Sequence, residues 1–271
     1  MEEEYPVPAM PRIMGIVNVT PDSFSDGGRF NDLSAAIDHA LQLVEEGADI
    51  IDIGGESTRP GSEGVPLQEE LRRVIPLVEA LVARIDRPVS VDTTKPEVMR
   101  AAAAAGARFL NDVNAFRAPG AVEVAAGLGL PVCVMHMQGE PRTMQVAPHY
   151  DDVVTEVRDF LVQRAAELER AGLARENIHI DPGFGFGKTL EHNLALLRHL
   201  DVLVATGYPV LVGMSRKSMI GAITGRPVGE RTPGSVAAAM LAAQKGAAVV
   251  RVHDVAATRD ALRVNAAVAA A

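Results

Sequence analysis

The chain has 271 residues, of which 48% are hydrophobic and 23% are charged. This composition is typical of a globular protein and excludes a disordered chain or a coiled coil. Its 26 lysine and arginine residues face 35 aspartate and glutamate residues, and the resulting net charge of −9 argues against a general binder of nucleic acid or membrane surfaces, because phosphate groups attract basic surfaces.

The beginning of the chain, Met1 to Glu4, is acidic where a signal peptide is basic. No apolar run in the sequence reaches membrane-spanning length. We therefore expect a cytoplasmic protein without a membrane segment. Cys133 is the only cysteine, which excludes an internal disulfide and a thiolate metal site.

Short apolar runs alternate with longer amphipathic segments along the chain. The first run, 13–17, precedes a polar, glycine-rich stretch and then a helical pattern over 33–44. The same unit then repeats. In chain order, the predicted strand and helix of each later unit are 50–53 and 67–85, 88–91 and 96–106, 108–110 and 120–126, 131–135 and 153–171, 178–180 and 190–199, 210–212 and 236–245, and 248–252 and 255 to near the C-terminus.

Eight strand–helix units predict a single (β/α)₈ TIM barrel, one domain over residues 1–271, because no linker rich in proline, glycine or serine divides the chain. A doubly wound open sheet also alternates strands and helices and is the structural alternative. We favour the barrel because the number of units closes it. In such barrels the active site lies at the C-terminal ends of the strands.

Nearly every predicted strand ends in a polar residue. For any one of them a helix cap is an equally good explanation, because Asp, Asn and Ser are favoured at helix N-termini. That explanation does not cover the whole set, since Lys217 and Arg251 are poor N-caps. The residues at the strand ends are Asn18, Glu56, Asp92, Asn111, Asp112, His136, Asp181, Ser215, Lys217, Arg251 and His253.

These side chains would meet at one mouth of the barrel, where they suit a heterocycle that carries phosphate. Asp92, Asn111 and Asp181 offer carboxylates and an amide for the edge of a flat ring with amino and lactam groups. Asn18 offers an amide to an anion or an oxygen to Mg²⁺. Cationic donors for phosphate or carboxylate are offered by Arg59, Lys217, Arg251 and His253.

The segment 183–189, Gly-Phe-Gly-Phe-Gly-Lys-Thr, ends like a nucleotide-binding P-loop. A P-loop needs glycine five positions before its last glycine, where Pro182 stands, and the dinucleotide-binding spacing fails at Lys188. We interpret the segment as a flexible loop. Its glycines permit unusual backbone dihedrals, and its phenylalanines are suited to line an apolar pocket.

Two longer motifs resemble those of the dihydropteroate synthases. The segment 18–28, Asn-Val-Thr-Pro-Asp-Ser-Phe-Ser-Asp-Gly-Gly, is similar to the first signature loop of that family, and 54–61, Gly-Gly-Glu-Ser-Thr-Arg-Pro-Gly, is similar to the second. Shorter motifs follow in family order at 91–93, 111–113, 135–139, 181–188, 215–218 and 251–254. The resemblance covers the chain from about Arg12 to the last predicted helix.

The resemblance implies a transferase of folate biosynthesis on a TIM barrel, a homodimer that uses Mg²⁺. Such an enzyme joins 6-hydroxymethyl-7,8-dihydropterin pyrophosphate to 4-aminobenzoate and releases pyrophosphate and 7,8-dihydropteroate. An SN1-like route through a dihydropterin cation is expected, because an aryl amine is a weak nucleophile. Closure of the two signature loops is expected to exclude water.

The resemblance also implies a role for individual residues at the matching positions. The expected catalytic residues are Asp181, Lys217, Arg251 and His253. The expected pterin-binding residues are Asp92, Asn111, Asp181, Lys217 and Met135. The pyrophosphate is expected to bind Asn18, Arg251 and His253, with Asn18 near the metal. The expected 4-aminobenzoate site consists of Thr58, Arg59, Pro60, Phe186, Ser215 and, from the mobile first loop, Phe24.

Three other functions are compatible with a barrel of this kind. A non-catalytic pterin- or folate-binding module of a methyltransferase system shares the pterin-holding groups, but such modules lack the paired signature loops and the Ser-Arg-Lys segment present here. A phosphate-binding barrel would use Lys217 as an amine nucleophile. An inactive paralogue would bind pterin without turnover.

Overall fold

The computed structural model of the chain describes residues 10–19, 29–57, 64–140 and 142–271. Within them eight parallel strands form one sheet in the order β6-β5-β4-β3-β2-β1-β8-β7. A parallel bridge between Ile180 and Val210 joins the two outer strands, and the Ile180 N–H donates to the Pro209 carbonyl at 2.9 Å. The strands are β1 Arg12–Asn18, β2 Ile50–Gly54, β3 Val89–Asp92, β4 Phe109–Asp112, β5 Val132–Met135, β6 Ile178–Asp181, β7 Leu211–Val212 and β8 Val249–Val252.

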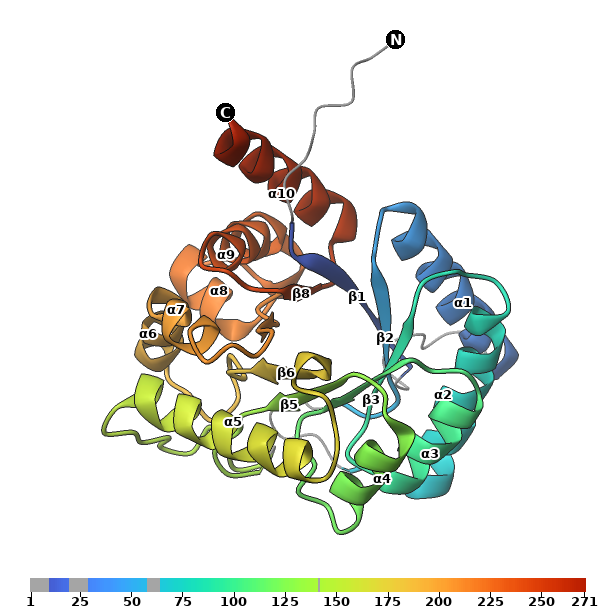
Figure 1. The fold of residues 1–271 in the computed structure, drawn as a ribbon. Helices are drawn as coiled ribbons and strands as arrows, with labels where there is room; N and C mark the ends of the chain where they lie inside the picture. Colours follow the sequence, from blue (N-terminus) through green and yellow to red (C-terminus); the bar gives the residue numbers. More distant parts are fainter. Residues whose placement is uncertain (1–9, 20–28, 58–63, 141) are drawn as a thin grey trace.

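Helices surround this ring of strands (Figure 1). The ring and its helices confirm the predicted (β/α)₈ barrel, and the closing bridge between β6 and β7 contradicts the open-sheet alternative. The helices after each strand are α1 Arg29–Glu45, α2 Leu67–Val82, α3 Pro96–Ala104, α4 Ala121–Leu128, α5 Val153–Arg170, α6 Leu190–Arg198, α9 Thr232–Gln244 and α10 Val255–Ala270.

Two short helices, α7 Leu200–Val204 and α8 Ser218–Thr224, lie where the sequence predicts no helix. Helix α7 follows α6 directly, with His199 between them, and buries Leu200 and Leu203. Helix α8 spans only seven residues and buries Met219 and Ile220. Segments this short carry too few apolar positions to show a helical period, so packing rather than pattern decides them.

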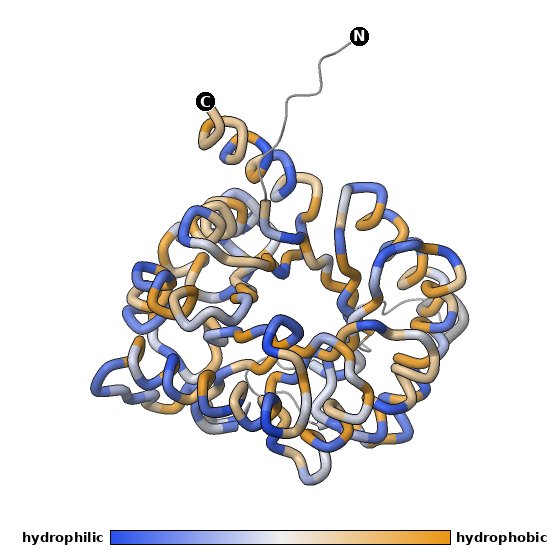
Figure 2. The backbone as a smooth tube through the Cα atoms, viewed as in Figure 1, coloured by the Kyte–Doolittle hydropathy of each residue, from blue (hydrophilic) through white to orange (hydrophobic). Residues whose placement is uncertain are grey.

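Alternation along the strands separates an outer apolar layer from the inside of the barrel. In β2, Ile51 and Ile53 pack outward against the helices, while Ile50 and Asp52 belong to the inward-facing positions. The inner apolar layer consists of Met14, Ile50, Phe109, Cys133, Leu211 and Val249. Figure 2 shows hydrophobic and hydrophilic residues interspersed along the backbone of the ring and its helices.

The next inward-facing position on several strands is polar, and this brings the functional groups to one end of the barrel. Asp52 follows Ile50 by two residues, Asn111 follows Phe109, and Arg251 follows Val249. Because side chains two apart in a strand share a face, each polar group stands on an apolar one beneath it. Within the described residues, no helix has the length and apolar character needed to span a membrane.

The packing of the outer helices predicts a clear difference between two leucine substitutions. Leu161 on α5 is 0% exposed, whereas Leu194 on α6 is 43% exposed. We expect Leu161→Ala to lower the free energy of unfolding by about 2–5 kcal/mol through lost burial and a residual cavity. Leu194→Ala is the matched control, with an expected change within about 0.5 kcal/mol. Urea denaturation of both variants measures the difference, and equal midpoints would contradict the described packing.

Candidate active site

One guanidinium group and two carboxylates occupy the centre of the barrel mouth. Arg251 Nε lies 2.6 Å from Asp52 Oδ2, and Arg251 Nη2 lies 3.2 Å from Asp92 Oδ2. Asn111 Nδ2 donates to the same Asp52 oxygen at 3.4 Å. Side-chain hydrogen bonds therefore link four strands, β2, β3, β4 and β8, in addition to the backbone hydrogen bonds of the sheet. This cluster joins three residues that the sequence predicts to one that it does not, Asp52.

Asp52 is the functional candidate that sequence reasoning misses. It lies inside the run Ile-Ile-Asp-Ile, two residues before the strand end, where an ordinary strand is apolar throughout. A carboxylate in the middle of a buried strand is itself the available signal, because such a group is tolerated only with a partner. Asp52 is 0% exposed, and among the described side-chain atoms its Oδ1 is one of four that are buried without a hydrogen-bond partner.

The crowding of these charges shifts their protonation. Burial raises the pKa of Asp92 from 3.8 to about 8; Arg251 opposes this shift, and the neighbouring Asp52 adds to it. Burial also works against the charge of Arg251, but Asp52 and Asp92 outweigh it and raise the pKa of the guanidinium. Burial beside a second carboxyl group disfavours the charged form of Asp92, so Asp92 carries a proton more readily than an exposed carboxyl group does.

A second group of polar side chains lies between β6 and β7. Asp181, at the end of β6, accepts a hydrogen bond from the Gly183 N–H at 2.7 Å. Lys217 donates to the Phe184 carbonyl, and its Nζ lies 4.2 Å from the centre of the Phe186 ring. Burial, with Arg251 as a lesser cause, lowers the pKa of Lys217 to about 8, and Asp181 opposes the shift. Burial raises the pKa of Asp181 against the pull of Lys217.

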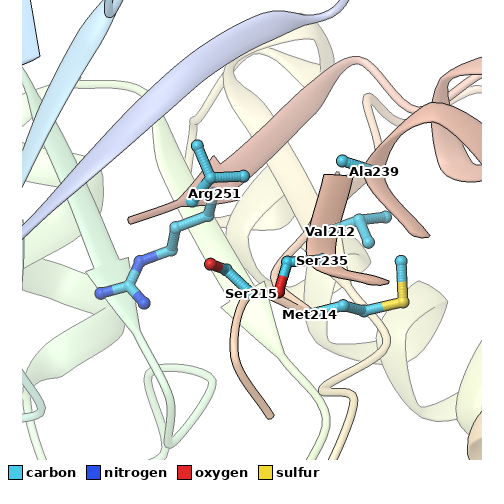
Figure 3. A pocket seen from close by; sticks show the side chains of 7 residues that line it. Val212, Met214, Ser215, Ser235, Ala239 and Arg251 are labelled. Atoms are coloured by element: carbon cyan, nitrogen blue, oxygen red, sulfur yellow. The ribbon is translucent and has the colours of Figure 1, made fainter. Parts of the chain in front are cut away.

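Ser215 and His253 connect the ends of β7 and β8. The His253 N–H donates to Ser215 Oγ at 3.2 Å, and His253 Nδ1 lies 3.0 Å from the same oxygen. Figure 3 shows the Ser215 hydroxyl on the side of the Arg251 side chain. The adjacent loops are tied by Arg216, whose guanidinium bonds both Asp254 oxygens, at 3.1 and 2.6 Å. This bidentate ion pair fixes the two loops relative to each other, and with them the neighbouring residues Ser215 and His253.

A cavity of about 740 Å³ opens beside Asp92, which is large enough for a substrate of two rings. Its lining includes Glu56, Val113 and Met137. An apolar cluster lies next to it and forms a surface on which a flat ring can pack. The members of that cluster are Val113, Met135, Met137, Met144 and Phe186. Phe186 thus belongs to the apolar cluster next to the cavity, while Phe184 packs into the core beneath the outer helices.

Three of the predicted strand-end residues bond groups of the neighbouring loops and helices, and one of them, Glu56, also lines the cavity. Asp112 accepts hydrogen bonds from the Asn114 and Phe116 N–H groups and so closes a turn. His136 Nδ1 lies 3.0 Å from Lys188 Nζ, and Glu56 bonds Lys95 Nζ at 2.5 Å. For Asp112, the cap-like explanation is therefore the better one. Four other expected site residues, Phe24, Thr58, Arg59 and Pro60, lie outside the described residues.

The chain matches the model of a family described as pterin binding enzymes over residues 14–253. It is 54% identical to the dihydropteroate synthase of Escherichia coli strain K12 over 94% of this chain and 90% of that protein. The structure of Xanthomonas albilineans dihydropteroate synthase with 4-aminobenzoic acid has a TM-score of 0.92 at 59% identity, covering 97% of this chain and 94% of that one. That of the Burkholderia cenocepacia enzyme complexed with 7,8-dihydropteroate has a TM-score of 0.87 at 54% identity, covering 96% and 92%.

The raised pKa of Asp92 predicts a pH-dependent stability. The folded protein keeps a proton on Asp92 up to about pH 8, whereas the unfolded chain releases it near 3.8. The free energy of unfolding therefore falls as the pH rises between these values. We expect Asp92→Asn to flatten this fall. It will not abolish it, because burial also raises the pKa of Asp112, to about 7.

Urea denaturation across this pH range measures the slope for the wild type and the variant. Asp38→Asn, at an exposed position on α1, is the matched control and should keep the wild-type slope. A wild-type slope in Asp92→Asn would show that Asp92 is ionised in the folded protein throughout.

Proposed function

The chain belongs to the pterin-binding enzymes and, within them, to the dihydropteroate synthases, and from this premise we propose how its barrel mouth carries out their reaction. It is a transferase of folate biosynthesis that joins 6-hydroxymethyl-7,8-dihydropterin pyrophosphate to 4-aminobenzoate, giving 7,8-dihydropteroate and pyrophosphate. The observation that carries the proposal is the convergence of carboxylates, an amide and two cations on inward-facing positions at one end of the barrel.

Asp92, Asn111 and Asp181 would bind the edge of the pterin. A pterin edge presents an amino group, ring nitrogens and a lactam oxygen, so it needs both acceptors and donors. Carboxylate oxygens accept from the amino group, and the amide of Asn111 or a protonated Asp92 donates to ring acceptors. Met135, which is 4% exposed and pairs in register with Asp181, would pack against the ring face. Lys217 would contribute a donor from the opposite wall.

Arg251 and His253 would hold the pyrophosphate, with Asn18 completing the site. Arg251 stands on β8, and His253 follows directly after it. Asn18, at the end of β1, lies over Gly54, where a Cβ atom would come within 3.3 Å of Asn18 Oδ1. Because residue 54 is a glycine, the Asn18 amide keeps slightly more room than any other residue there would leave it.

Mg²⁺ would fit beside this amide. The described residues contain no group of three or more His, Cys, Asp or Glu that could hold a metal ion. Mg²⁺ keeps several waters and binds through few protein oxygens together with substrate phosphates, so Asn18 Oδ1 plus pyrophosphate oxygens is a sufficient donor set. When bound there, the ion would neutralise charge on the leaving pyrophosphate.

Phe186 and Ser215 would form the described part of the 4-aminobenzoate site. Phe186 offers an apolar face with Lys217 above it, and Ser215 offers a hydroxyl beside His253. The resemblance adds Thr58, Arg59, Pro60 and Phe24 to this site. An aromatic carboxylate needs both an apolar wall and a cationic or hydroxyl donor, and this combination supports the assignment.

The reaction would begin with departure of pyrophosphate from the pterin methyl carbon. The C–O bond breaks with its electron pair going to pyrophosphate, and the amine nitrogen then bonds the resulting cation and loses a proton. Asp181 would stabilise the dihydropterin cation, while Arg251 and His253 would stabilise the leaving group. These groups are fixed by strands and hydrogen bonds before the charge develops, which is the condition under which electrostatic stabilisation is strongest.

We also propose that residues 1–271 form a single domain and that the protein is a cytoplasmic homodimer. The family match over 14–253 supports the single domain. Two exposed apolar side chains close together in the sequence, Ile223 on α8 and Val228 shortly after it, support an interface between two copies.

Pyrophosphate release tests the function directly. Purified protein is given the pterin pyrophosphate and Mg²⁺, with and without 4-aminobenzoate. Release that depends on 4-aminobenzoate, together with formation of dihydropteroate, is the expected result. Pterin binding without release would instead favour a non-catalytic binding module or an inactive paralogue.

Substitution of the charged groups between β6 and β7 should reduce turnover. We expect Lys217→Ala and Asp181→Ala each to lower kcat by a factor of about 10² or more, as removal of a preorganised electrostatic group does. Arg198→Ala removes an exposed charge on α6 and should leave kcat unchanged. Steady-state pyrophosphate release compares the three variants. Wild-type turnover in both Lys217→Ala and Asp181→Ala would refute the site assignment.

A further inference from the structure

The loop between β6 and α6 is held by hydrogen bonds to each carbonyl from Gly183 to Gly187. From the sequence we expect a flexible loop here. In the structure, Lys217 donates to the Phe184 carbonyl, Gln145 Nε2 to that of Gly185 at 2.5 Å, and Tyr150 Oη to that of Gly187 at 2.8 Å. The remaining two carbonyls, those of Gly183 and Phe186, both accept from Lys188 Nζ at 3.0 Å.

Lys188 is buried within the curve of this loop. Its side chain is 3% exposed, and its Nζ also lies 3.0 Å from His136 Nδ1 and 3.4 Å from the His136 carbonyl. No carboxylate bonds the ammonium group in the described residues, so carbonyl dipoles and one imidazole nitrogen replace its hydration. Burial lowers the pKa of Lys188 to about 7. Burial of an ammonium group is costly unless hydrogen bonds replace its hydration, and the loop carbonyls and His136 supply those bonds here.

His136 completes the arrangement as an acceptor. Burial, followed by the charge of Lys188, lowers the pKa of His136 to about 3, so the ring is neutral. With Lys188 donating to Nδ1, the ring proton lies on Nε2. The ring is fixed from its other side by Phe160, whose ring meets it edge to face with centroids 4.9 Å apart.

The backbone of this loop lies very close to the backbone that follows β5, and Lys188 bonds both. A Cβ at Gly183 would lie 1.9 Å from the His136 carbonyl oxygen, and one at Gly187 would lie 2.4 Å from that of Gln138. Both glycines also have positive φ, 66° and 61°. The loop therefore packs directly against the backbone after β5, and the ammonium group bonds both segments at once.

The same loop carries groups of the proposed site. The Gly183 N–H holds Asp181 Oδ1, and Phe186 belongs to the apolar cluster beside the cavity. The Gly183 carbonyl, on the other side of that residue, accepts from Lys188 and also from the Phe186 N–H at 3.1 Å. A shift of the loop would thus move both the acceptor for the pterin and the wall for the aryl amine.

We propose that Lys188 is a positioning residue, whose buried ammonium group fixes the β6–α6 loop so that Phe186 and Asp181 face the substrates. This inference rests on the proposed function for the identity of those substrates. The lysine that sequence reasoning sets aside with a failed P-loop match thereby acquires a role that involves no phosphate. Lys188 itself touches neither substrate, because its Nζ points at the loop's own carbonyls and at His136.

Lys188→Met tests the proposal, because methionine keeps an unbranched apolar stem and removes the ammonium group. We expect the KM for 4-aminobenzoate to rise by about tenfold or more, the effect of losing a charge-assisted hydrogen bond. The KM for the pterin pyrophosphate should rise as well but by less, because Asp181 stands on β6 and only its hydrogen bond from the Gly183 N–H depends on the loop. Amide hydrogen exchange at 183–189 should become faster, with exchange in β1 to β4 unchanged. Lys245→Met, a half-buried lysine after α9, is the control and should match the wild type.

A lysine that served folding alone would lower the urea midpoint and leave both KM values and local exchange as in the wild type, and that result would overturn the proposal. If Lys188→Met does not fold, Lys188→Gln keeps a polar donor but removes the ammonium group that bonds the Gly183 and Phe186 carbonyls, and a smaller change of the same kind is expected. No change in either measurement for Lys188→Gln would then overturn the proposal. Failure of the wild type to release pyrophosphate would count against the proposed function, while the exchange comparison would still report on Lys188.

Discussion

The mouth of this barrel depends on Arg251 being shared by two buried carboxylates. The guanidinium opposes the effect of burial on Asp92, and the two carboxyl groups in turn provide the hydrogen bonds that its own burial requires. Because the three residues come from β2, β3 and β8, the pairing fixes the strands around one point. The incomplete balance, with two acids for one base, keeps Asp92 easily protonated and makes the mouth ready to accept groups of either hydrogen-bonding sense.

Burial explains why the pKa values of the residues at the barrel mouth are strongly shifted. Asp92, Asp181 and Lys217 all have pKa values shifted toward their neutral forms, and in each case desolvation is the largest cause. A ligand that brings a complementary charge or hydrogen bond would restore what burial removes. These poorly hydrated groups therefore interact strongly with a substrate of complementary charge. This is the condition for stabilising a cation and a departing anion close together.

The order of the fold and most of the mouth are predictable from the sequence, because both follow from local patterns. Apolar runs indicate the eight strands, and polar residues directly after them indicate Asp92, Asn111, Asp181 and Arg251. The features that sequence patterns miss have a common cause, because they depend on contacts between distant segments. Asp52 is hidden inside an apolar strand and gains meaning only from a partner 199 residues away. Asp112 looks identical to a mouth residue until its carboxylate is seen to close a turn.

The proposed binding residues for the two substrates are held in place in two different ways. The proposed pterin groups Asp92 and Asn111 stand on strands, whose register is fixed by the sheet, while Phe186 stands on a loop, whose position must be imposed by side chains. A strand is already held by the hydrogen bonds of the sheet. A loop beside the open mouth needs other hydrogen bonds, because its carbonyls would otherwise bond water and the loop would be mobile. The hydrogen bonds around Lys188 hold this loop as the hydrogen bonds of the sheet hold a strand. The position of Phe186, the proposed wall for the aryl amine, thus depends on a few side chains that bond the loop carbonyls rather than on the sheet.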